Sequence, residues 1–188
     1  SDLTILNLHD IPRAMLVVGG GVIGCEYACM FSALGIKVTL LEGRDRLLAF
    51  LDAEVAQLLT RCMTEMGIDV RFNEQVAGVV AKPSGLTATL ASGAKLAADT
   101  ILVAAGRSGN TDKLNLPAAG IAVGKRGCID VNDRYQTNVP HIYAAGDVIG
   151  FPALAATSME QARVAMVHAF DLKYKTRVAA LLPYGIYT

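Results

Sequence analysis

Hydrophobic and polar positions follow two different periods over the first part of the chain. Short apolar or β-branched runs are typical of buried strands, and longer segments with apolar residues three and four positions apart are typical of helices. Asp52 is a residue type that caps helices, and Gly35 and Gly67 are placed to end them. The pattern predicts strands at Met15–Val18, Lys37–Leu41 and Ile68–Phe72, and helices at Val22–Leu34 and Ala53–Met66.

The next segment has the pattern of antiparallel strands. Polar and apolar residues alternate around Val76–Ala81 and Leu86–Leu90, and Pro83–Gly85 between them consists of turn residues. A further buried strand is predicted at Asp99–Ala105. Strands that alternate with helices, followed by antiparallel pieces, predict an α/β fold.

The chain changes character after Arg107. Residues 108–136 are rich in loop residues, and a short strand is predicted at Ile142–Ala145, followed by a Gly-Asp turn. A long helical pattern covers Leu154–Phe170, whereas the tail 171–188 has no clear period.

The composition is more apolar than is usual for a globular chain. Of the 188 residues, 53% are apolar before the 18 glycines are added, whereas ordinary chains reach roughly 45–50% with glycine included. The excess suggests surfaces that pack on parts of a longer protein. No apolar run approaches the ~18 residues of a membrane helix. The net charge of zero argues against nucleic acid or an anionic membrane as the main partner.

The cysteines and histidines give no sign of a metal or redox centre. Cys25 and Cys29 lie four residues apart on a predicted helix, and none of the four cysteines forms a Cys-x-x-Cys pair. Buried, reduced packing residues are therefore favoured over a redox pair. The three histidines lack ligand spacing. Together with the lack of a signal-peptide pattern, these features favour a cytoplasmic location.

Glycines concentrate where the first predicted strand meets the first predicted helix. Gly19, Gly21 and Gly24 form the pattern G-x-G-x-x-G, and an acid closes the second strand at Glu42, which is the context of a dinucleotide-binding motif. The first glycine permits a tight turn, the second lets a diphosphate approach the backbone, and the third lets helix and strand pack closely. The helix N-terminus then offers N–H groups to the phosphates. A purely structural glycine turn is the alternative.

Two charged residues bear on the choice between NAD and NADP. Glu42 should accept hydrogen bonds from the adenosine ribose, and a 2′-phosphate there would meet a like charge at a cost of about 1–4 kcal/mol. Arg44 lies two residues further on and could pair with that phosphate. The other interpretation of Arg44 is a solvated surface charge, so both NAD(H) and NADP(H) remain candidates.

Two later stretches carry recognisable motifs: DTILVAAGRSGN at 99–110, and TNVPHIYAAGDV at 137–148, which matches T-x-x-x-x-h-Y-A-h-G-D in full. Both resemble motifs of the two-dinucleotide-binding flavoproteins, which include lipoamide dehydrogenase, glutathione reductase and mercuric reductase. Within this family, the chain most resembles soluble pyridine nucleotide transhydrogenases. The stretches that carry this resemblance are RDRLLAFLD, GRSGNTDKLNL, YQTNVPHIYAAGDVIGFPALA and YGIYT. The resemblance covers essentially the whole chain. Glu42 departs from this resemblance, because an acid at this position is more typical of lipoamide dehydrogenase.

The resemblance implies a division into parts. Residues 14–107 would form a Rossmann-like NAD(P)-binding domain with a three-layer β/β/α arrangement. Residues 1–13 would be a linker from an FAD-binding half, 108–175 the returning part of that FAD domain, and 176–188 the start of an interface domain. The N-terminal FAD-binding motif and most of the interface domain would lie outside this chain, which resembles a fragment of a homo-oligomeric enzyme.

The resemblance also implies which residues bind NAD(H), NADP(H) and FAD. Glu42 is expected at the ribose, Val76 at the adenine through its backbone, and Gly106 at the nicotinamide end. Asp147 is expected to hydrogen-bond the flavin ribityl chain, and N–H groups that open the helix 154–170 could stabilise negative charge on the reduced flavin. Residues expected along the NAD pyrophosphate and nicotinamide are Gly19, Gly20, Gly21, Val22, Ile23, Gly24 and Glu26. Residues expected beside the isoalloxazine ring are Ala153, Leu154, Ala155 and Ala156.

The implied activity is hydride transfer from NADPH to NAD through the flavin, with both nucleotides using one site in turn. No side chain is expected to act as an acid or base, because the cofactor does the chemistry and the protein supplies orientation and electrostatics. One alternative is a portion of a lipoamide-dehydrogenase-like disulfide reductase, whose redox cysteines would lie upstream. Another is a stand-alone NAD-binding module without turnover. For this chain by itself, we expect NAD(H) binding, little FAD retention and no catalysis.

Overall fold

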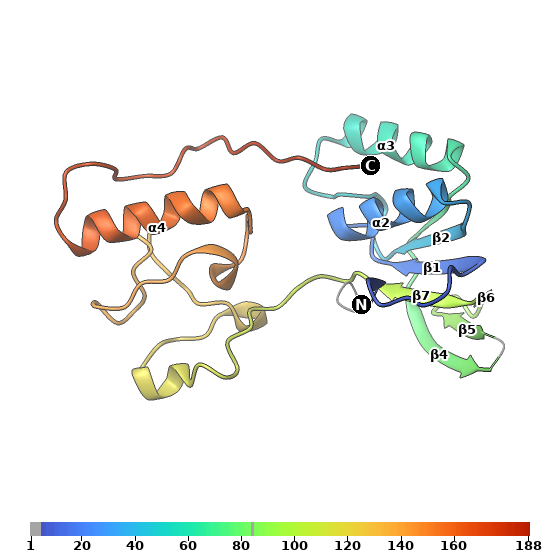
Figure 1. The fold of residues 1–188 in the computed structure, drawn as a ribbon, viewed down its shortest axis with the longest axis horizontal. Helices are drawn as coiled ribbons and strands as arrows, with labels where there is room; N and C mark the ends of the chain where they lie inside the picture. Colours follow the sequence, from blue (N-terminus) through green and yellow to red (C-terminus); the bar gives the residue numbers. More distant parts are fainter. Residues whose placement is uncertain (1–4, 84) are drawn as a thin grey trace. The chain divides into compact units, whose positions relative to one another are not determined.

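The computed structural model describes residues 5–83 and 85–188 and groups them into two compact units. The first unit runs to Gly106 and also includes Gly185–Thr188, and the second is Arg107–Tyr184. Each unit has an apolar core of its own, and Figure 1 shows the helices and strands of both.

A four-stranded parallel sheet forms the centre of the first unit, with the strand order β3-β2-β1-β7. The strands are β1 (Ala14–Val18), β2 (Lys37–Glu42), β3 (Asp69–Phe72) and β7 (Thr100–Val103). Helix α2 (Val22–Ala33) connects β1 to β2, and α3 (Ala53–Glu65) connects β2 to β3. Both helices cover the same face of the sheet (Figure 1). Parallel strands need such crossover connections, which bury the face that they cover.

A three-stranded antiparallel sheet covers the other face (Figure 1). Its strands are β4 (Val76–Lys82), β5 (Gly85–Leu90) and β6 (Lys95–Ala98), in the order β4-β5-β6. Side chains of β1 therefore alternate between two cores: Met15 and Val17 pack towards the helices, and Leu16 packs with Ala88 and Leu90 of the antiparallel sheet. This three-layer β/β/α arrangement confirms the predicted fold class.

The ends of the predicted helices are confirmed in detail. Asp52 caps α3, because its Oδ1 accepts a hydrogen bond from the Glu54 N–H at 2.9 Å. Gly35 and Gly67 follow the two helices with φ angles of +81° and +89°, a region that favours glycine.

The predicted strand Asp99–Ala105 is partly wrong. The structure contains β7 at Thr100–Val103 and an unpredicted strand, β6, immediately before it. Asp99 lies between the two strands, and its carboxylate accepts the backbone N–H groups of Arg13 and Ala14 at 2.8 and 3.1 Å. This bridge ties the start of β1 to the start of β7. The predicted turn residue Ser84 lies outside the described residues, as do residues 1–4 of the predicted linker.

The second unit is mostly irregular, as the loop-rich sequence predicts. It contains the short helices η1 (Leu116–Ala119), η2 (Lys125–Gly127) and η3 (Gly146–Ile149), and the longer helix α4 (Ala155–Ala169). The predicted strand Ile142–Ala145 is wrong, because only an isolated bridge joins Tyr143 to Gln136. The backbone of this segment bonds locally instead: the Ala144 N–H donates to the Tyr135 carbonyl at 3.0 Å.

Neither a membrane-spanning helix nor a metal site is found among residues 5–83 and 85–188. No helix in these ranges is long and apolar enough to cross a membrane. No cluster of three or more histidine, cysteine or acidic side chains in them could hold a metal ion.

Candidate nucleotide-binding site

Gly19 makes the turn that follows β1. Its φ angle is +111°, and an added Cβ atom would lie 2.5 Å from the Ala104 carbonyl oxygen. Its own N–H donates to the Leu41 carbonyl of the neighbouring strand at 2.8 Å. Both the backbone conformation and the space therefore require glycine here.

Gly21 and Gly24 lack side chains for different reasons. An added Cβ at Gly24, in the first turn of α2, would lie 1.8 Å from the Gly19 carbonyl oxygen, so helix and turn touch at this point. Gly21, the N-cap residue of α2, has a φ of −81° and nothing within 4 Å of an added Cβ. Neither the packing nor the backbone of the chain itself requires glycine at Gly21, which leaves room for a ligand to approach.

The start of α2 presents a row of free backbone donors. Gly21 provides no side-chain cap, and its carbonyl accepts the first helical hydrogen bond, from the Cys25 N–H at 2.9 Å. No described residue accepts a hydrogen bond from the N–H groups of Gly21, Val22 or Ile23. Such unpaired donors and the positive end of the helix dipole favour a phosphate.

Glu42 lies at the end of β2, beside this turn. Its Oε2 accepts the Gly20 N–H at 2.7 Å, and its Oε1 accepts the Arg44 N–H at 2.9 Å. Two backbone donors thus fix the carboxylate at the edge of the glycine turn. Each oxygen keeps further acceptor capacity, so the geometry allows hydrogen bonds from ribose hydroxyl groups.

Two residues that the sequence analysis did not assign to the site, Leu48 and Cys25, hold Gly20 in place through its carbonyl group. The carbonyl oxygen accepts the Leu48 N–H at 2.9 Å and the Cys25 thiol at 3.6 Å. Leu48 adopts a φ of +44°, which leucine rarely does, so its sequence carries no signal for this contact. An added Cβ at Gly20 would lie 2.6 Å from Cδ2 of Leu47, a fully buried side chain.

The two cysteines of α2 are buried, as predicted. Burial, with smaller contributions from Cys29, Glu42 and Glu26, raises the pKa of Cys25 to about 12. The thiol therefore stays protonated and can donate to the Gly20 carbonyl. Cys62, in contrast, is exposed on α3.

The remaining predicted residues of the first unit lie around the same sheet. Glu26, on α2, accepts the Tyr187 backbone N–H through Oε1 at 2.9 Å, so the last residues of the chain reach this helix. Val76 begins β4 opposite Leu90 and is half-buried. Gly106 is the last residue of the unit's main segment and has a φ of +112°.

The second unit holds the residues predicted to contact a flavin. Asp147 lies in η3 and is exposed. Leu154 is the N-cap residue of α4, without a side-chain cap, and Ala155 and Ala156 form its first turn. Ala153 does not open the helix as predicted, because it precedes the N-cap with a φ of +52°.

A mostly apolar cavity of about 370 Å³ lies at the start of α4. Its lining includes Leu154 to Thr157 at the start of the helix and Val178, Leu181 and Leu182 of the C-terminal tail. An ion pair between Lys175 and Glu160 attaches the tail to the helix. No described residue accepts a hydrogen bond from the N–H groups of Ala155 or Ala156. The start of α4 thus combines apolar walls with free donors.

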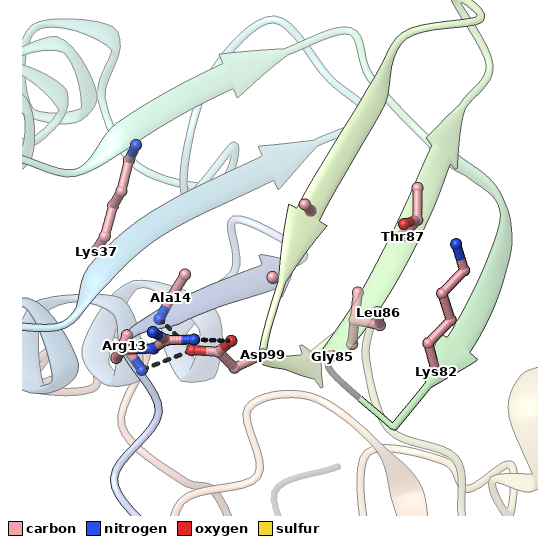
Figure 2. Close-up of a pocket in the computed structure, with 10 residues that line it drawn as sticks. Arg13, Ala14, Lys37, Lys82, Gly85, Leu86, Thr87 and Asp99 are labelled. Carbon is pink, nitrogen blue, oxygen red and sulfur yellow. Dashed lines mark hydrogen bonds and ion pairs between the residues drawn. The ribbon is translucent and has the colours of Figure 1, made fainter.

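A separate cavity, of about 500 Å³, lies at the other end of the parallel strands (Figure 2). Arg13, Ala14 and Lys37 line it where β1 and β2 begin, and Lys82 lines its far side on β4. Asp99 pairs with the Arg13 guanidinium here at 3.6 Å. The glycine turn follows the opposite ends of these strands, so this cavity is not the site that the motif predicts.

A glycine turn between a parallel strand and a helix, with an acid at the end of the next strand, defines a dinucleotide-binding protein of the Rossmann class. The sequence matches the pyridine nucleotide-disulphide oxidoreductase family over residues 1–169. The chain belongs to that family.

Curated relatives have similar sequences over nearly the whole chain. The soluble pyridine nucleotide transhydrogenase of Mycobacterium bovis BCG Pasteur is 52% identical over 184 residues, 98% of this chain and 39% of the relative. The Aliivibrio fischeri protein of the same name is 46% identical over 185 residues, again 98% of this chain and 39% of the relative. The chain thus spans about two fifths of the length of these relatives.

Two solved structures resemble the fold. LpdA from Mycobacterium tuberculosis matches with a TM-score of 0.85 and 30% identity, over 93% of this chain and 38% of that one. The HOCl-induced flavoprotein disulfide reductase RclA from Escherichia coli matches with a TM-score of 0.83 and 32% identity, over 92% of this chain and 39% of that one.

Proposed function

We propose that this chain is the NAD(P)-binding region, with part of the FAD-binding region, of a flavoprotein that transfers hydride between NADPH and NAD. The observation that carries the proposal is the row of free N–H groups at Gly21–Ile23 beside the fixed carboxylate of Glu42. The names of the relatives support the reaction, and the family description supports the pyridine nucleotide.

The first unit would bind and orient the nucleotide. The open backbone at Gly21 would approach the diphosphate, which the N–H groups of Val22 and Ile23 would hold. Glu42 would accept hydrogen bonds from the adenosine ribose, and the Val76 backbone would lie beside the adenine. Glu26 and Gly106 would lie at the nicotinamide end. No side chain needs to exchange a proton with the nucleotide, because hydride transfer requires orientation rather than acid–base catalysis.

Arg44 would give this site its tolerance of NADP(H). Its backbone N–H donates to Oε1 of Glu42, and no described residue pairs with its exposed guanidinium. A 2′-phosphate beside Glu42 would therefore find a cation two residues away that could bind it through two hydrogen bonds. Glu42 would favour NAD(H), and Arg44 would keep NADP(H) binding close enough for one site to serve both.

The second unit would hold an edge of FAD, and its residues fit that group. The apolar cavity at the start of α4 suits an aromatic ring, and the N–H groups of Ala155 and Ala156 suit its electron-rich edge. Leu154 and Ala153 would pack beside the ring, and Asp147 would hold the ribityl hydroxyls. A bound flavin supplies acceptance of a hydride from one nucleotide and its donation to the next.

The whole enzyme would be larger than this chain. We infer that 14–107 is the NAD(P) domain, 108–175 the returning part of the FAD domain, and 1–13 and 176–188 are connections to the remainder. The complete protein would be a homo-oligomer, without nucleic acid or membrane as a partner. Its relatives are named soluble enzymes, and free cysteines suit a reducing compartment such as the cytoplasm.

Calorimetry on this chain tests the nucleotide site directly. NADH should bind and ADP-ribose should compete with it, because both carry the diphosphate and the adenosine ribose. Folded protein that takes up neither would refute the proposal. The reaction itself is tested in the full-length protein, by reduction of an NAD analogue with NADPH. Reduction of lipoamide instead, without transfer between nucleotides, would favour the disulfide reductase that the RclA similarity suggests.

A further inference from the structure

One polar stripe of α4 contacts the segment that carries Asp147. Ser158, Gln161 and His168 lie three and seven residues apart, and this spacing puts them on one face of the helix. Gln161 is the most enclosed of the three, with only 5% of its surface exposed. Its Oε1 accepts the Gly146 N–H at 2.7 Å, which is the peptide group immediately before Asp147.

The same segment touches the stripe at two further points. An added Cβ at Gly146 would lie 2.4 Å from Oγ of Ser158, and Gly146 has a φ of +82°, so glycine alone fits this contact. Two helical turns beyond Gln161 and further along the stripe, Nδ1 of His168 lies 2.8 Å from the Tyr143 hydroxyl. Segment 143–146 is therefore aligned along α4 by three separate contacts.

We propose that Gln161 is a positioning residue that sets the place of the Asp147 carboxylate relative to the start of α4. The inference rests on the proposed function, in which both elements contact one flavin. Gln161 holds the peptide group before Asp147, and the Val148 carbonyl after it accepts the Ile129 N–H at 2.9 Å. Asp147 is thus fixed on both sides by its backbone, while its exposed side chain stays available to a ligand.

The contact is specific to an oxygen acceptor at this position. Gln161→Met keeps the length of the side chain but leaves the buried Gly146 N–H without its partner, and Gln161→Glu keeps an oxygen. In the full-length flavoprotein, we expect Gln161→Met to weaken FAD binding by about 10-fold or more, judged from the usual value of a buried hydrogen bond. Gln161→Glu should restore most of the affinity. Val167→Ala, a buried change on α4 that leaves Gly146 alone, controls for lost helix stability.

A double-mutant cycle separates positioning from stability. If Gln161 acts through Asp147, Gln161→Met should cost little further FAD affinity once Asp147→Ala has removed the carboxylate. Fully additive losses would overturn the proposal, as would a Gln161→Met affinity equal to the wild type. Failure of the wild-type protein to bind FAD would instead refute the proposed function.

A second measurement needs no flavin and uses this chain as it is. Amide exchange at Gly146 should speed up in Gln161→Met, and the NMR resonances of the Asp147 side chain should shift, while both stay near their wild-type values in Val167→Ala. Unchanged Gly146 exchange and Asp147 resonances in Gln161→Met would overturn the proposal whatever the flavin does.

Discussion

Gly21 and Gly24 should respond in opposite ways to the same substitution. Gly24→Ala places a methyl group 1.8 Å from the Gly19 carbonyl oxygen, whereas Gly21→Ala places it in open space. Overpacking typically costs about 1–3 kcal/mol and sometimes more, and a clash with backbone belongs at the upper end. Alanine regains about 1 kcal/mol of helix propensity at Gly24. We therefore expect Gly24→Ala to lose about 2 kcal/mol of stability and Gly21→Ala to lose no more than about 1 kcal/mol, because alanine is a poorer N-cap residue than glycine.

Substitution of Gly21 should weaken nucleotide binding, although it changes stability little. The added methyl group keeps a diphosphate away from the N–H groups of Val22 and Ile23, and hydrogen bonds to charged groups are worth about 1.5–3 kcal/mol each. The loss of one such bond predicts NADH binding about 10- to 100-fold weaker. Gly78→Ala on β4, also a glycine with nothing within 4 Å of an added Cβ, is the matched control and should bind normally.

Urea unfolding and NADH titration of the three variants measure both effects. Gly24→Ala should lower the unfolding midpoint by roughly 1 M, for an m-value of about 2 kcal/mol per M. A Gly21→Ala protein that is fully stable and binds NADH as tightly as the wild type would refute the reasoning, because the open backbone at Gly21 would then have no ligand to admit.

Four further outcomes follow from the charges and thiols of the first unit. Arg44→Ala should weaken NADPH binding but not NADH binding in parallel titrations. Equal losses of affinity for the two nucleotides would indicate that the Arg44 guanidinium is only a solvated surface charge. Because the pKa of Cys25 is raised to about 12, the folded state keeps a proton that the unfolded state releases from about pH 9. The free energy of unfolding should therefore fall as the pH rises from 9 towards 12, and it should fall less steeply in Cys25→Ala. In native protein, Ellman's reagent should modify the exposed Cys62 before Cys25. Two backbone N–H groups lower the pKa of Asp99 below its ordinary 3.8. The contribution of Asp99 to stability should therefore be present above that pH and be lost on acidification. Asp99→Ala should remove this contribution and speed amide exchange at Ala14.

The glycine turn could be predicted because its glycines are close together in the sequence and the motif fixes the spacing of its acid. Strand period, helix period and the spacing of Gly19, Gly21 and Gly24 all agree, and the acid that completes the motif follows at the end of the next strand. The hairpin of β4 and β5 and the Asp52 cap were predictable for the same reason. In the hairpin and the cap, neighbours in the sequence are also neighbours in the structure, whereas Gly20 and Glu42 are 22 positions apart and are brought together by the spacing of the motif.

The contacts that fix the site were not predictable, because they join residues distant in sequence or unusual in conformation. Leu48 reaches the Gly20 carbonyl only by adopting a positive φ, against the preference of leucine. Tyr187 reaches Glu26 across 161 positions. The strand predicted at Ile142–Ala145 failed because apolar residues there pack into the small core of the second unit without a strand to pair with.

The lock on Gly20 bears on how one site could serve two nucleotides. Glu42 holds the Gly20 N–H, and Leu48 and Cys25 hold its carbonyl, so the turn is already in the conformation that leaves the following N–H groups free. A preorganised turn lowers the ordering cost of binding for any ligand with a diphosphate, and NAD(H) and NADP(H) share that group. Binding energy common to both would then come from the rigid turn. Discrimination would be confined to the ribose, where Glu42 and Arg44 would act in opposite directions. An enzyme that exchanges the two nucleotides in turn would need this weak discrimination, because strong selection at the ribose would block one half of its cycle.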